Sequence, residues 1–283
     1  MNIKIMVAHH KNGVIIQDDV YLPIQVGKEQ SREDLGIQGD NIGDNISKLN
    51  PVYCEMTAAY WGWKNLEADY IGLCHYRRYF TFEAMPFKER LREKYRFYKK
   101  KTMGKLLDPG EHYSFQEQII VWNPIVFKEM AFSFSRKLKN ILIKEDYDIV
   151  VPRPYIENSQ NVEQHFREIG KDHLRTLKEI VSECYPDFSP YLTKALSSHK
   201  LYAANMFVMR RDLYDDYCKT VFGILDSQLK KMVSIRWCLD PLAEGCYSRV
   251  SGYLAEILTS AYIMKIEINA GKVLYVNSSF LAT

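Results

Sequence analysis

Short apolar runs that alternate with helical patterns are the feature of this sequence that most restricts its fold. The runs are rich in β-branched and aromatic residues, as buried strands are. The clearest helix start is Asn50 followed by Pro51, because Asn is a favoured N-cap and Pro suits the first helical position. Alternating strands and helices predict an α/β fold with a mostly parallel or mixed central sheet flanked by helices. Strands are expected at 3–8, 70–73, 119–122, 147–152, 201–209 and, as an edge strand, 266–276, and helices at 51–65, 83–107, 126–144, 159–184, 211–231 and 241–265.

The length of 283 residues fits one large domain or two small ones and is sufficient for a substantial core. No internal repeat and no low-complexity linker divides the chain. We therefore expect a single domain over residues 1–283, with a basic helical insertion around residues 83–145.

Basic charge is concentrated in one segment, residues 87–107. That segment holds nine Lys or Arg and two Glu, so it carries +7 and the rest of the chain carries −4. A basic amphipathic helix there is expected either to lie on an anionic membrane surface or to be an ordinary solvated face. The acidic remainder argues against a general attraction to nucleic acid.

The cysteines and the N-terminus indicate a reduced, cytoplasmic protein. The six cysteines form no Cys-x-x-Cys pair, and none stands at zinc-ligand spacing from a histidine. The apolar run at 3–8 is too short for a secretory signal, and no run reaches the ~18–20 apolar residues that a membrane span needs. Any contact with the inner face of the cytoplasmic membrane is therefore expected to be peripheral.

The run at 70–73 ends in a cluster of basic and aromatic side chains. His75, Tyr76, Arg77 and Arg78 follow it directly. Arginine suits bidentate recognition of phosphate or carboxylate, and ligands of open α/β sheets bind beyond the carboxyl ends of strands. We interpret this stretch as an anion-binding site, with ion pairing of the arginines across the fold as the alternative. Because neighbouring strand residues point to opposite faces, one arginine is expected only to support the other.

Other strand ends supply further candidate ligands. His9 follows the first strand, Arg153 and Tyr155 follow a later one, and Asn205 lies at the centre of another. A nucleotide is expected near His9, and an acceptor or sugar near Arg153, Tyr155 and Asn205. A solvated loop is the alternative for the residues after the first strand.

A polar, glycine-bearing loop at 27–47 contains a near-repeat of Gly-Asp-Asn-Ile. Its Asp40, Asp44 and Asn45 are candidates for contacts with the ribose or base of a nucleotide. Their side chains can equally bond their own backbone and shape the loop.

The last long helix places Arg249, Gly252 and Glu256 at i, i+3 and i+7, and therefore on one face. Arg249 and Glu256 lie about 10 Å apart along the axis, and the glycine leaves room for a close neighbour. Glu256, Asp240 and Glu244 are candidates for a general base, and Arg249 is a further catalytic candidate. A structural ion pair between Arg249 and Glu256 is the alternative.

Several well-known catalytic motifs are absent. The sequence has no P-loop, no Gly-x-Gly-x-x-Gly after the first strand, no Gly-x-Ser-x-Gly and no His-Glu-x-x-His. P-loop NTPases, dinucleotide enzymes, α/β-hydrolases and zincins are therefore disfavoured. No Asp-x-Asp triplet, the usual metal–diphosphate clamp of GT-A glycosyltransferases, follows an apolar strand.

Seven segments together resemble a bacterial family catalogued as domain of unknown function 4422, which is associated with glycosyltransferases of capsule, exopolysaccharide and lipopolysaccharide synthesis. The Cys-His-Tyr-Arg-Arg core is the most specific match, and the matches extend over nearly the whole chain. The segments are GDNIS (43–47), NPVYCE (50–55), YWGWKN (60–65), GLCHYRRYF (72–80), YDIVVP (147–152), NMFVM (205–209) and RVSGYLAE (249–256).

The resemblance implies a GT-A-like glycosyltransferase, a hexosyltransferase that depends on a nucleotide sugar. The donor is expected to be UDP-linked, with galactose or galactofuranose favoured, and the acceptor to be a growing, lipid-linked glycan of the bacterial surface. His75, Tyr76, Arg77 and Arg78 would neutralise the departing diphosphate in place of the absent Asp-x-Asp. Diphosphate binding is then expected to be metal-independent or metal-optional, with Mn²⁺ or Mg²⁺ as the optional ion and no other cofactor.

The chain departs from the family pattern at two places. About sixty residues separate Arg78 from the strand at 147, where the family usually has few, so the intervening basic segment resembles an insertion. Gln164-His165-Phe166 stands where the family has Gln-Tyr followed by His, and His165 therefore receives no role.

Two other classes of protein fit parts of the sequence. The basic aromatic segment at 87–107 also suits a nucleic-acid-binding protein, although the acidic remainder of the chain is against it. A non-catalytic carbohydrate-binding module would share the aromatic residues without any turnover.

Overall fold

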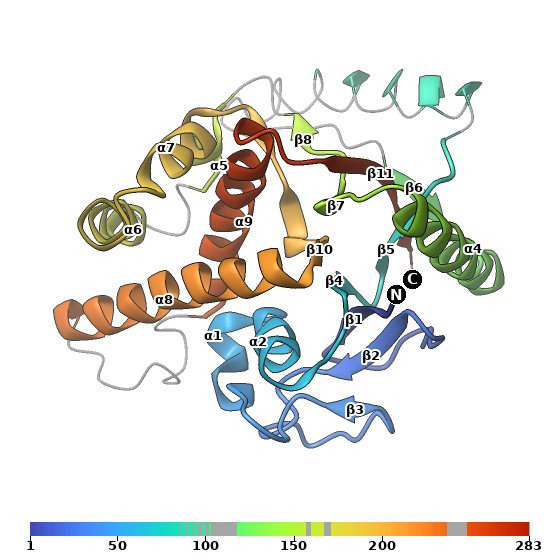
Figure 1. The fold of residues 1–283 in the computed structure, drawn as a ribbon, viewed down its shortest axis with the longest axis horizontal. Coiled ribbons are helices and arrows are strands. Elements are labelled where there is room, and N and C mark those ends of the chain that lie inside the picture. Colours follow the sequence, from blue (N-terminus) through green and yellow to red (C-terminus); the bar gives the residue numbers. More distant parts are fainter. Residues whose placement is uncertain are drawn as a thin grey trace.

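The computed structural model describes residues 1–85, 87–88, 90–92, 94–95, 98–99, 102, 118–156, 160–166, 171–236 and 248–282. Over these ranges a nine-stranded mixed sheet runs through the molecule, with helices packed against both faces (Figure 1). The mixed α/β architecture expected from the sequence is confirmed.

The N-terminal part of the sheet is parallel. β1 (Ile3–His9) pairs with β2 (Tyr21–Gln25) on one side and with β4 (Tyr70–His75) on the other. The register sets Ala8 opposite His75, so the carboxyl ends of β1 and β4 meet at one edge of the sheet. The residues that follow these two strands are brought together there, as ligand-binding residues are in open α/β sheets.

The second side of β4 is divided between two strands. β10 (Phe207–Arg210) pairs antiparallel with its first four residues, and β5 (Arg78–Thr81) joins it at the hairpin pair of His75 and Arg78. The sheet therefore forks at the end of β4, and the hairpin that carries the two arginines forms one branch.

The last strand, β11 (Val273–Leu281), lies inside the sheet. It pairs with β5, with β6 (Gln118–Val121) and with β7 (Ile149–Pro152), and β7 in turn pairs with β10. The prediction of an edge strand at 266–276 is wrong, because the partners of β11 come from three distant parts of the chain that local sequence does not connect.

The span predicted as one helix from Pro51 contains two helices, α1 (Asn50–Tyr53) and α2 (Met56–Asn65). Cys54 separates them with φ 53°, in a backbone region that non-glycine residues rarely adopt. The break places Cys54 and Glu55 in the wall of a cavity at the carboxyl ends of β1 and β4.

Two apolar cores lie on opposite faces of the sheet. The larger core packs under α1, α2 and four further helices, and the smaller one packs under α4 (Pro124–Lys144), whose Phe127, Phe134 and Leu138 are buried. The part of the chain from Gln118 onwards is thus integral to the sheet and its core. The four further helices are α6 (Lys171–Cys184), α7 (Ser189–Ser197), α8 (Arg211–Arg236) and α9 (Val250–Ile268).

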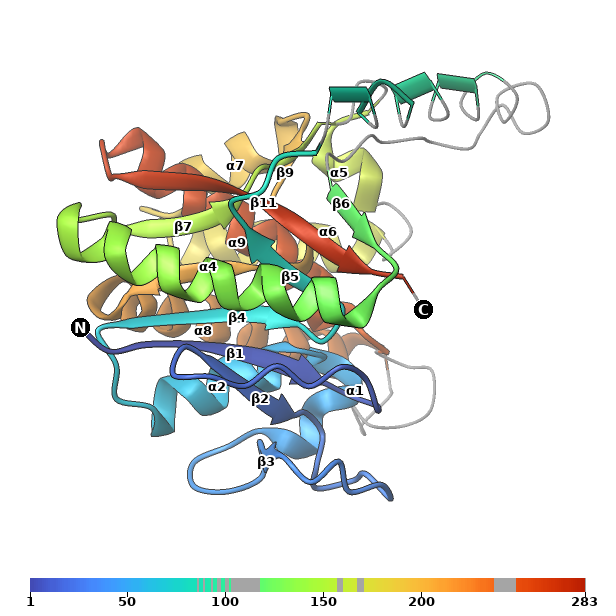
Figure 2. The same cartoon turned by 90° about the vertical axis from the view of Figure 1, so that its right-hand side faces the viewer.

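The described positions between 87 and 102 are helical and project from the body of the molecule (Figure 2). The remaining elements are short, and β8 pairs with β9 as a separate antiparallel ribbon. They are β3 (Gln38–Gly39), η1 (Ser47–Leu49), β8 (Tyr155–Ile156), α5 (Val162–His165), β9 (Lys200–Leu201) and η3 (Ala203–Asn205).

Candidate functional site

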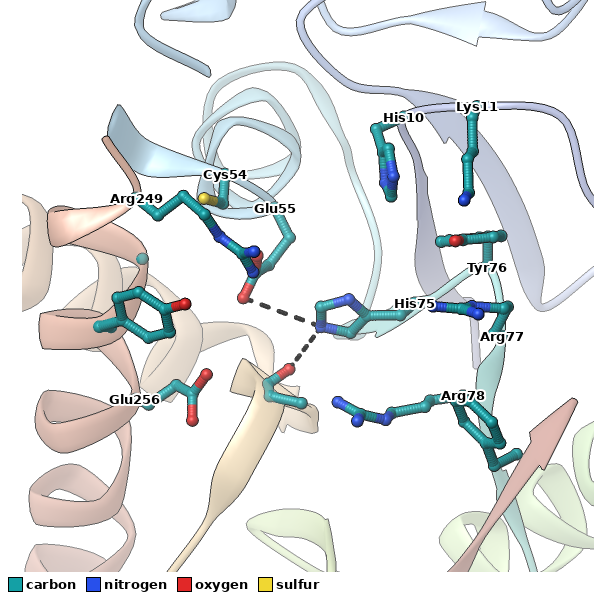
Figure 3. Close-up of a pocket in the computed structure, with 14 residues that line it drawn as sticks. His10, Lys11, Cys54, Glu55, His75, Tyr76, Arg77, Arg78, Arg249 and Glu256 are labelled. Atoms are coloured by element: carbon teal, nitrogen blue, oxygen red, sulfur yellow. Dashed lines mark hydrogen bonds and ion pairs between the residues drawn. The ribbon is translucent and has the colours of Figure 1, made fainter. Parts of the chain in front are cut away.

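A cavity of about 350 Å³ lies between the carboxyl ends of β1 and β4 and the N-terminal end of α9 (Figure 3). Residues far apart in the sequence line it, and six of them are candidates that the sequence singled out. These six are His75, Tyr76, Arg77, Arg78, Arg249 and Glu256. The fold therefore brings together the arginine hairpin and the last long helix, two features that are far apart in the sequence.

Both hairpin arginines line the cavity. His75 and Arg78 form a cross-strand pair, so Tyr76 and Arg77 occupy the turn and the alternation of a regular strand is interrupted. Arg77 lies over the Tyr76 ring at 5.1 Å and over the Phe280 ring at 5.3 Å. Arg78 lies 5.7 Å from the Phe280 ring. The expectation that one arginine merely supports the other does not hold, because aromatic rings position both.

The cavity is strongly cationic. Among the described residues, its wall carries Lys11, Arg77, Arg78 and Arg249 against the carboxyl groups of Glu55 and Glu256. Within the described part of the chain, neither Arg77 nor Arg78 has a carboxylate oxygen within 4.0 Å. The alternative of ion pairs across the fold is therefore not realised among the described residues, and both arginines line the cavity.

His75 stands at the centre of the site in a defined tautomer. Its Nε2 lies 2.7 Å from the backbone oxygen of Ala204 and 3.8 Å from Oε1 of Glu55. A carbonyl oxygen only accepts, so Nε2 carries the proton and donates it to Ala204. This hydrogen bond fixes the orientation of the ring and leaves Nδ1 available to a ligand.

Glu55 is a site residue that the sequence reasoning missed. Its carboxylate lines the cavity and accepts a hydrogen bond of 2.7 Å from Nδ2 of Asn205. Asn205 itself is fully buried, and it also donates to the Gly252 carbonyl and accepts from the Thr259 hydroxyl. Asn205 thus lies beneath the cavity wall, and the structure shows it holding Glu55 and α9 together. The family-like segment NPVYCE (50–55) ends at Glu55, but its place in the cavity wall depends on the helix break at Cys54, which the sequence does not reveal.

Glu256 has the chemical properties of a general base. Its pKa is raised to about 7, mainly by burial and also by the neighbouring Glu55, while a backbone hydrogen bond from Ala204 and the charges of Arg78 and Arg249 oppose the shift. No ion pair joins Glu256 to Arg249 among the described residues: the Arg249 guanidinium bonds the Cys54 thiol and lies over the Tyr253 ring at 5.3 Å. A carboxyl group with a pKa near neutrality exchanges protons readily at physiological pH.

Left-handed backbone conformations are concentrated around the cavity. Cys54, Ala204 and Arg249 line it with φ of 53°, 64° and 61°, and Asn205 lies behind them with φ 48°. Non-glycine residues in this region store strain, which persists only when surrounding contacts impose it. Gly252 has a steric role here, since a Cβ atom would lie 3.1 Å from the Cys54 sulfur. The close neighbour for which this glycine leaves room is therefore Cys54.

The predicted nucleotide contacts lie outside this cavity. His9 is buried, its ring nitrogens have no hydrogen-bond partner among the described residues, and burial lowers its pKa to about 4. The next two residues, His10 and Lys11, line the cavity in its place. Asp40 is fully buried and accepts hydrogen bonds from two backbone amides and the Ser47 hydroxyl, so its carboxylate is engaged within the loop.

Asp44 and Asn45 also take part in loop structure. Asp44 accepts from the Tyr60 hydroxyl, and Asn45 donates to the Gly43 carbonyl and accepts from the Ser47 amide. Their assignment to ribose or base contacts stays a prediction.

The remaining candidates are dispersed. Tyr155 lines a second cavity next to the first, Arg153 is exposed and lines neither, and Asp240 and Glu244 lie outside the described residues. Among the described residues, no group of three or more His, Cys, Asp or Glu side chains is arranged to hold a metal ion. A search of the same residues for a membrane-spanning helix found none with the required length and apolar character.

Two comparisons with known proteins gave matches, and both extend over most or all of the chain. The sequence profile described as "Domain of unknown function (DUF4422)" matches residues 4–267. The apo structure of the bifunctional glycosyltransferase WbbM superposes with a TM-score of 0.77 and 27% sequence identity, and the match covers 100% of this chain and 46% of that protein. The chain therefore spans about half the length of its structural relative. A search of curated proteins found no match.

Proposed function

Because the chain belongs to the DUF4422 family and shares its fold with part of a glycosyltransferase, we propose that it transfers a sugar from a nucleotide-diphosphate donor to a bacterial surface glycan. The observation that carries this proposal is the union, in one cavity, of four cationic side chains with a carboxyl group of near-neutral pKa. The cationic side chains suit the binding of a diphosphate, and the carboxyl group suits the deprotonation of a hydroxyl. The fold is proposed to be of the GT-A type.

The cationic wall is proposed to bind the donor diphosphate. Arg77 and Arg78 present planar donor groups from a hairpin held by β-sheet pairing, and Lys11 adds charge from the end of β1. His75 lines the same cavity, and because its Nε2 donates to the Ala204 carbonyl, its Nδ1 donates to a phosphate oxygen only when the imidazole is protonated. Negative charge grows on the leaving diphosphate in the transition state, so donors that are already in place stabilise it without reorganising.

Glu256 is proposed to be the general base. The carboxylate removes the proton of the acceptor hydroxyl while that oxygen forms a bond to C1 of the donor sugar. The bond between C1 and the diphosphate oxygen breaks, and its electron pair leaves with the nucleoside diphosphate. The proton remains on Glu256, and the negative charge that develops on the leaving diphosphate is stabilised by Arg77 and Arg78. This route is an inverting displacement.

The arginine hairpin is proposed to make a divalent metal ion dispensable. In many GT-A enzymes an Asp-x-Asp triplet holds the ion that neutralises the diphosphate, and no such triplet follows a strand here. Positively charged side chains supply the same neutralisation in this cavity. The donor is proposed to be UDP-linked, with galactose or galactofuranose as the sugar.

The exposed helical positions between 87 and 102 are proposed to contact an anionic membrane, where a lipid-linked acceptor resides. Phe87, Leu91, Tyr95 and Tyr98 lie at i, i+4, i+8 and i+11, so they share one helical face, and each is more than half exposed. Basic residues flank this face on both sides, which is the composition of helices that lie in a lipid interface. The flanking residues are Lys88, Arg90, Arg92, Lys94 and Lys99.

The test is a thermal-shift panel of nucleotide sugars, followed by donor turnover in excess chelator. A bound donor raises the melting temperature by mass action, so the panel identifies the nucleotide. We expect stabilisation by UDP-galactose or UDP-galactofuranose and turnover that persists with chelator. Loss of turnover that manganese restores would overturn the metal-independent mechanism, and binding with no turnover of any donor would indicate a carbohydrate-binding module.

A further inference from the structure

A second cavity of about 200 Å³ lies directly beside the cationic one. Arg78, Ala204 and Glu256 line both cavities, so they form the partition between them. The far side of the second cavity is formed by α5 and by the β8–β9 ribbon, through Tyr155 and Leu201. None of the candidate diphosphate ligands except Arg78 reaches it.

The two cavities differ in chemistry. Among the described residues that line them, the first cavity has four cationic side chains, whereas the second has one, Arg78, together with one carboxyl group, that of Glu256. Its other polar groups are neutral hydrogen-bonding groups of Tyr155 and Asn161 and two imidazoles, and they alternate with apolar residues. A site of this kind suits a neutral, hydroxyl-rich ligand with apolar C–H faces better than it suits an anion.

Tyr155 is placed to recognise such a ligand. It is half-buried on β8 and lines the second cavity together with Arg78 and Glu256. Burial raises the pKa of its hydroxyl, Arg78 lowers it and Glu256 raises it. An aromatic ring packs against the C–H face of a sugar, and the phenol hydroxyl supplies a hydrogen bond at the same time. His199 is exposed and stands at the mouth of the cavity.

We propose that the second cavity is the acceptor subsite and holds the terminal sugar ring of the glycan that is extended. This inference rests on the proposed transfer reaction. The acceptor hydroxyl then approaches Glu256 from one side of the partition while the donor sugar lies on the other side. The space accommodates one sugar ring, so the enzyme recognises the end of the glycan and not an extended stretch of it.

The experiment separates acceptor recognition from donor chemistry. The probes are octyl glycosides of galactose, glucose and N-acetylglucosamine, offered together with the nucleotide sugar that the thermal-shift panel selects. Three rates are compared: transfer to the glycosides, hydrolysis of the donor by water without acceptor, and donor binding. Tyr155→Ala and His199→Ala remove contacts, and Ala203→Leu fills the cavity from η3. Ile156→Ala is the matched control, because Ile156 is the exposed neighbour of Tyr155 on β8 and does not line the cavity.

We expect all three cavity variants to raise the acceptor KM at least tenfold, while donor hydrolysis and donor affinity stay within twofold of the parent. Ile156→Ala should leave all three quantities unchanged. An acceptor KM that is insensitive to the three substitutions, parallel losses of donor hydrolysis, or no transfer to any glycoside would each overturn the assignment. Failure of the transferase proposal itself would show differently, as a parent protein that binds or turns over no nucleotide sugar.

Discussion

The side-chain amide of Asn205 donates a 2.7 Å hydrogen bond to the carboxylate of Glu55, although the two residues are 150 positions apart in the chain. The same amide reaches the Gly252 carbonyl, so one buried side chain joins the start of α2, η3 and the first turn of α9. These three elements carry the acidic half of the candidate active site. Its geometry therefore depends on a buried residue that does not itself line the cavity.

We expect Asn205→Ala to lower the free energy of unfolding by about 3 kcal/mol, since the carboxylate of Glu55, the Gly252 carbonyl and the Thr259 hydroxyl all lose a buried partner. Denaturant unfolding followed by circular dichroism measures this change. Asn12→Ala, at an exposed asparagine, is the control and should change stability by less than about 0.5 kcal/mol. Equal effects of the two substitutions would contradict the bracing role of Asn205.

Glu256→Gln should reduce the transfer rate by about 10²–10⁴-fold, because glutamine cannot accept the acceptor proton. Donor affinity in the thermal-shift assay should be preserved. In the parent protein kcat/KM should rise with pH up to about 7, where the base becomes ionised, and stay level above it. Glu183→Gln, at an exposed carboxyl group on α6, is the matched control. Unchanged turnover by Glu256→Gln would remove this residue from the mechanism.

The raised pKa of Glu256 also predicts how stability depends on pH. Between the ordinary pKa of glutamate and about 7, the unfolded chain has released the proton that the folded chain still holds. The free energy of unfolding therefore falls as pH rises through this window. Glu256→Gln removes the titrating group, so its melting temperature should exceed that of the parent at pH 8 and match it at pH 4. If the melting temperature of the parent rose relative to that of Glu256→Gln between pH 5 and 7, the raised pKa of Glu256 would be contradicted.

The hairpin arginines should act mainly on donor binding. Arg77→Ala and Arg78→Ala are each expected to weaken affinity for the nucleotide sugar by about 10–100-fold, as the loss of a charge-assisted contact to phosphate does. Arg77→Lys should recover only part of the loss, because an ammonium cannot make a bidentate contact. Titration calorimetry measures these affinities, and Arg175→Ala, on the exposed surface of α6, provides the control. If both alanine variants bound the nucleotide sugar with the affinity of the parent, the hairpin would be excluded as the diphosphate site.

Membrane contact is predicted to depend on both the apolar face and the charge of the helical positions between 87 and 102. Binding to vesicles with anionic lipid should weaken as salt increases, because the attraction of the basic residues is screened. The double change Phe87→Ser and Tyr95→Ser should reduce binding at every salt concentration, whereas Ile143→Ser, at an exposed apolar residue of α4, should not. Vesicle flotation measures both effects, and no binding at low salt would refute the prediction.

Local sequence patterns predicted the strands and helices that carry the site better than they predicted how these elements pack together. The apolar runs at β1, β4 and β7 and the basic cluster after β4 are continuous in sequence, so alternation and residue type located them. The face shared by Arg249 and Glu256 followed from helical periodicity in the same way. The loop residues Asp40, Asp44 and Asn45 could not be assigned in this way. An Asp or Asn that hydrogen-bonds its own loop cannot be distinguished in the sequence from one that binds a ligand.

The missing parts of the prediction depend on contacts between distant residues. Cys54, with φ 53°, lies close to Gly252 of α9, and the helix break at this residue places Glu55 in the cavity wall. The interior position of β11 depends on pairings with strands from three other regions. Neither relationship leaves a periodic signal in its own segment, so neither could be read from the sequence.

The position of β11 between β5 and β6 has an evolutionary consequence. β5 ends at Thr81 and β6 begins at Gln118, and both are fixed by pairing with β11, so the ends of the connecting segment are held whatever its length. The entropy of closing such a connection grows only slowly with the number of residues in it. Relatives can therefore lengthen, shorten or replace the basic segment while the arginine hairpin keeps its place. The proposed membrane contact and the proposed transfer chemistry therefore reside in separate parts of the chain, which can change independently.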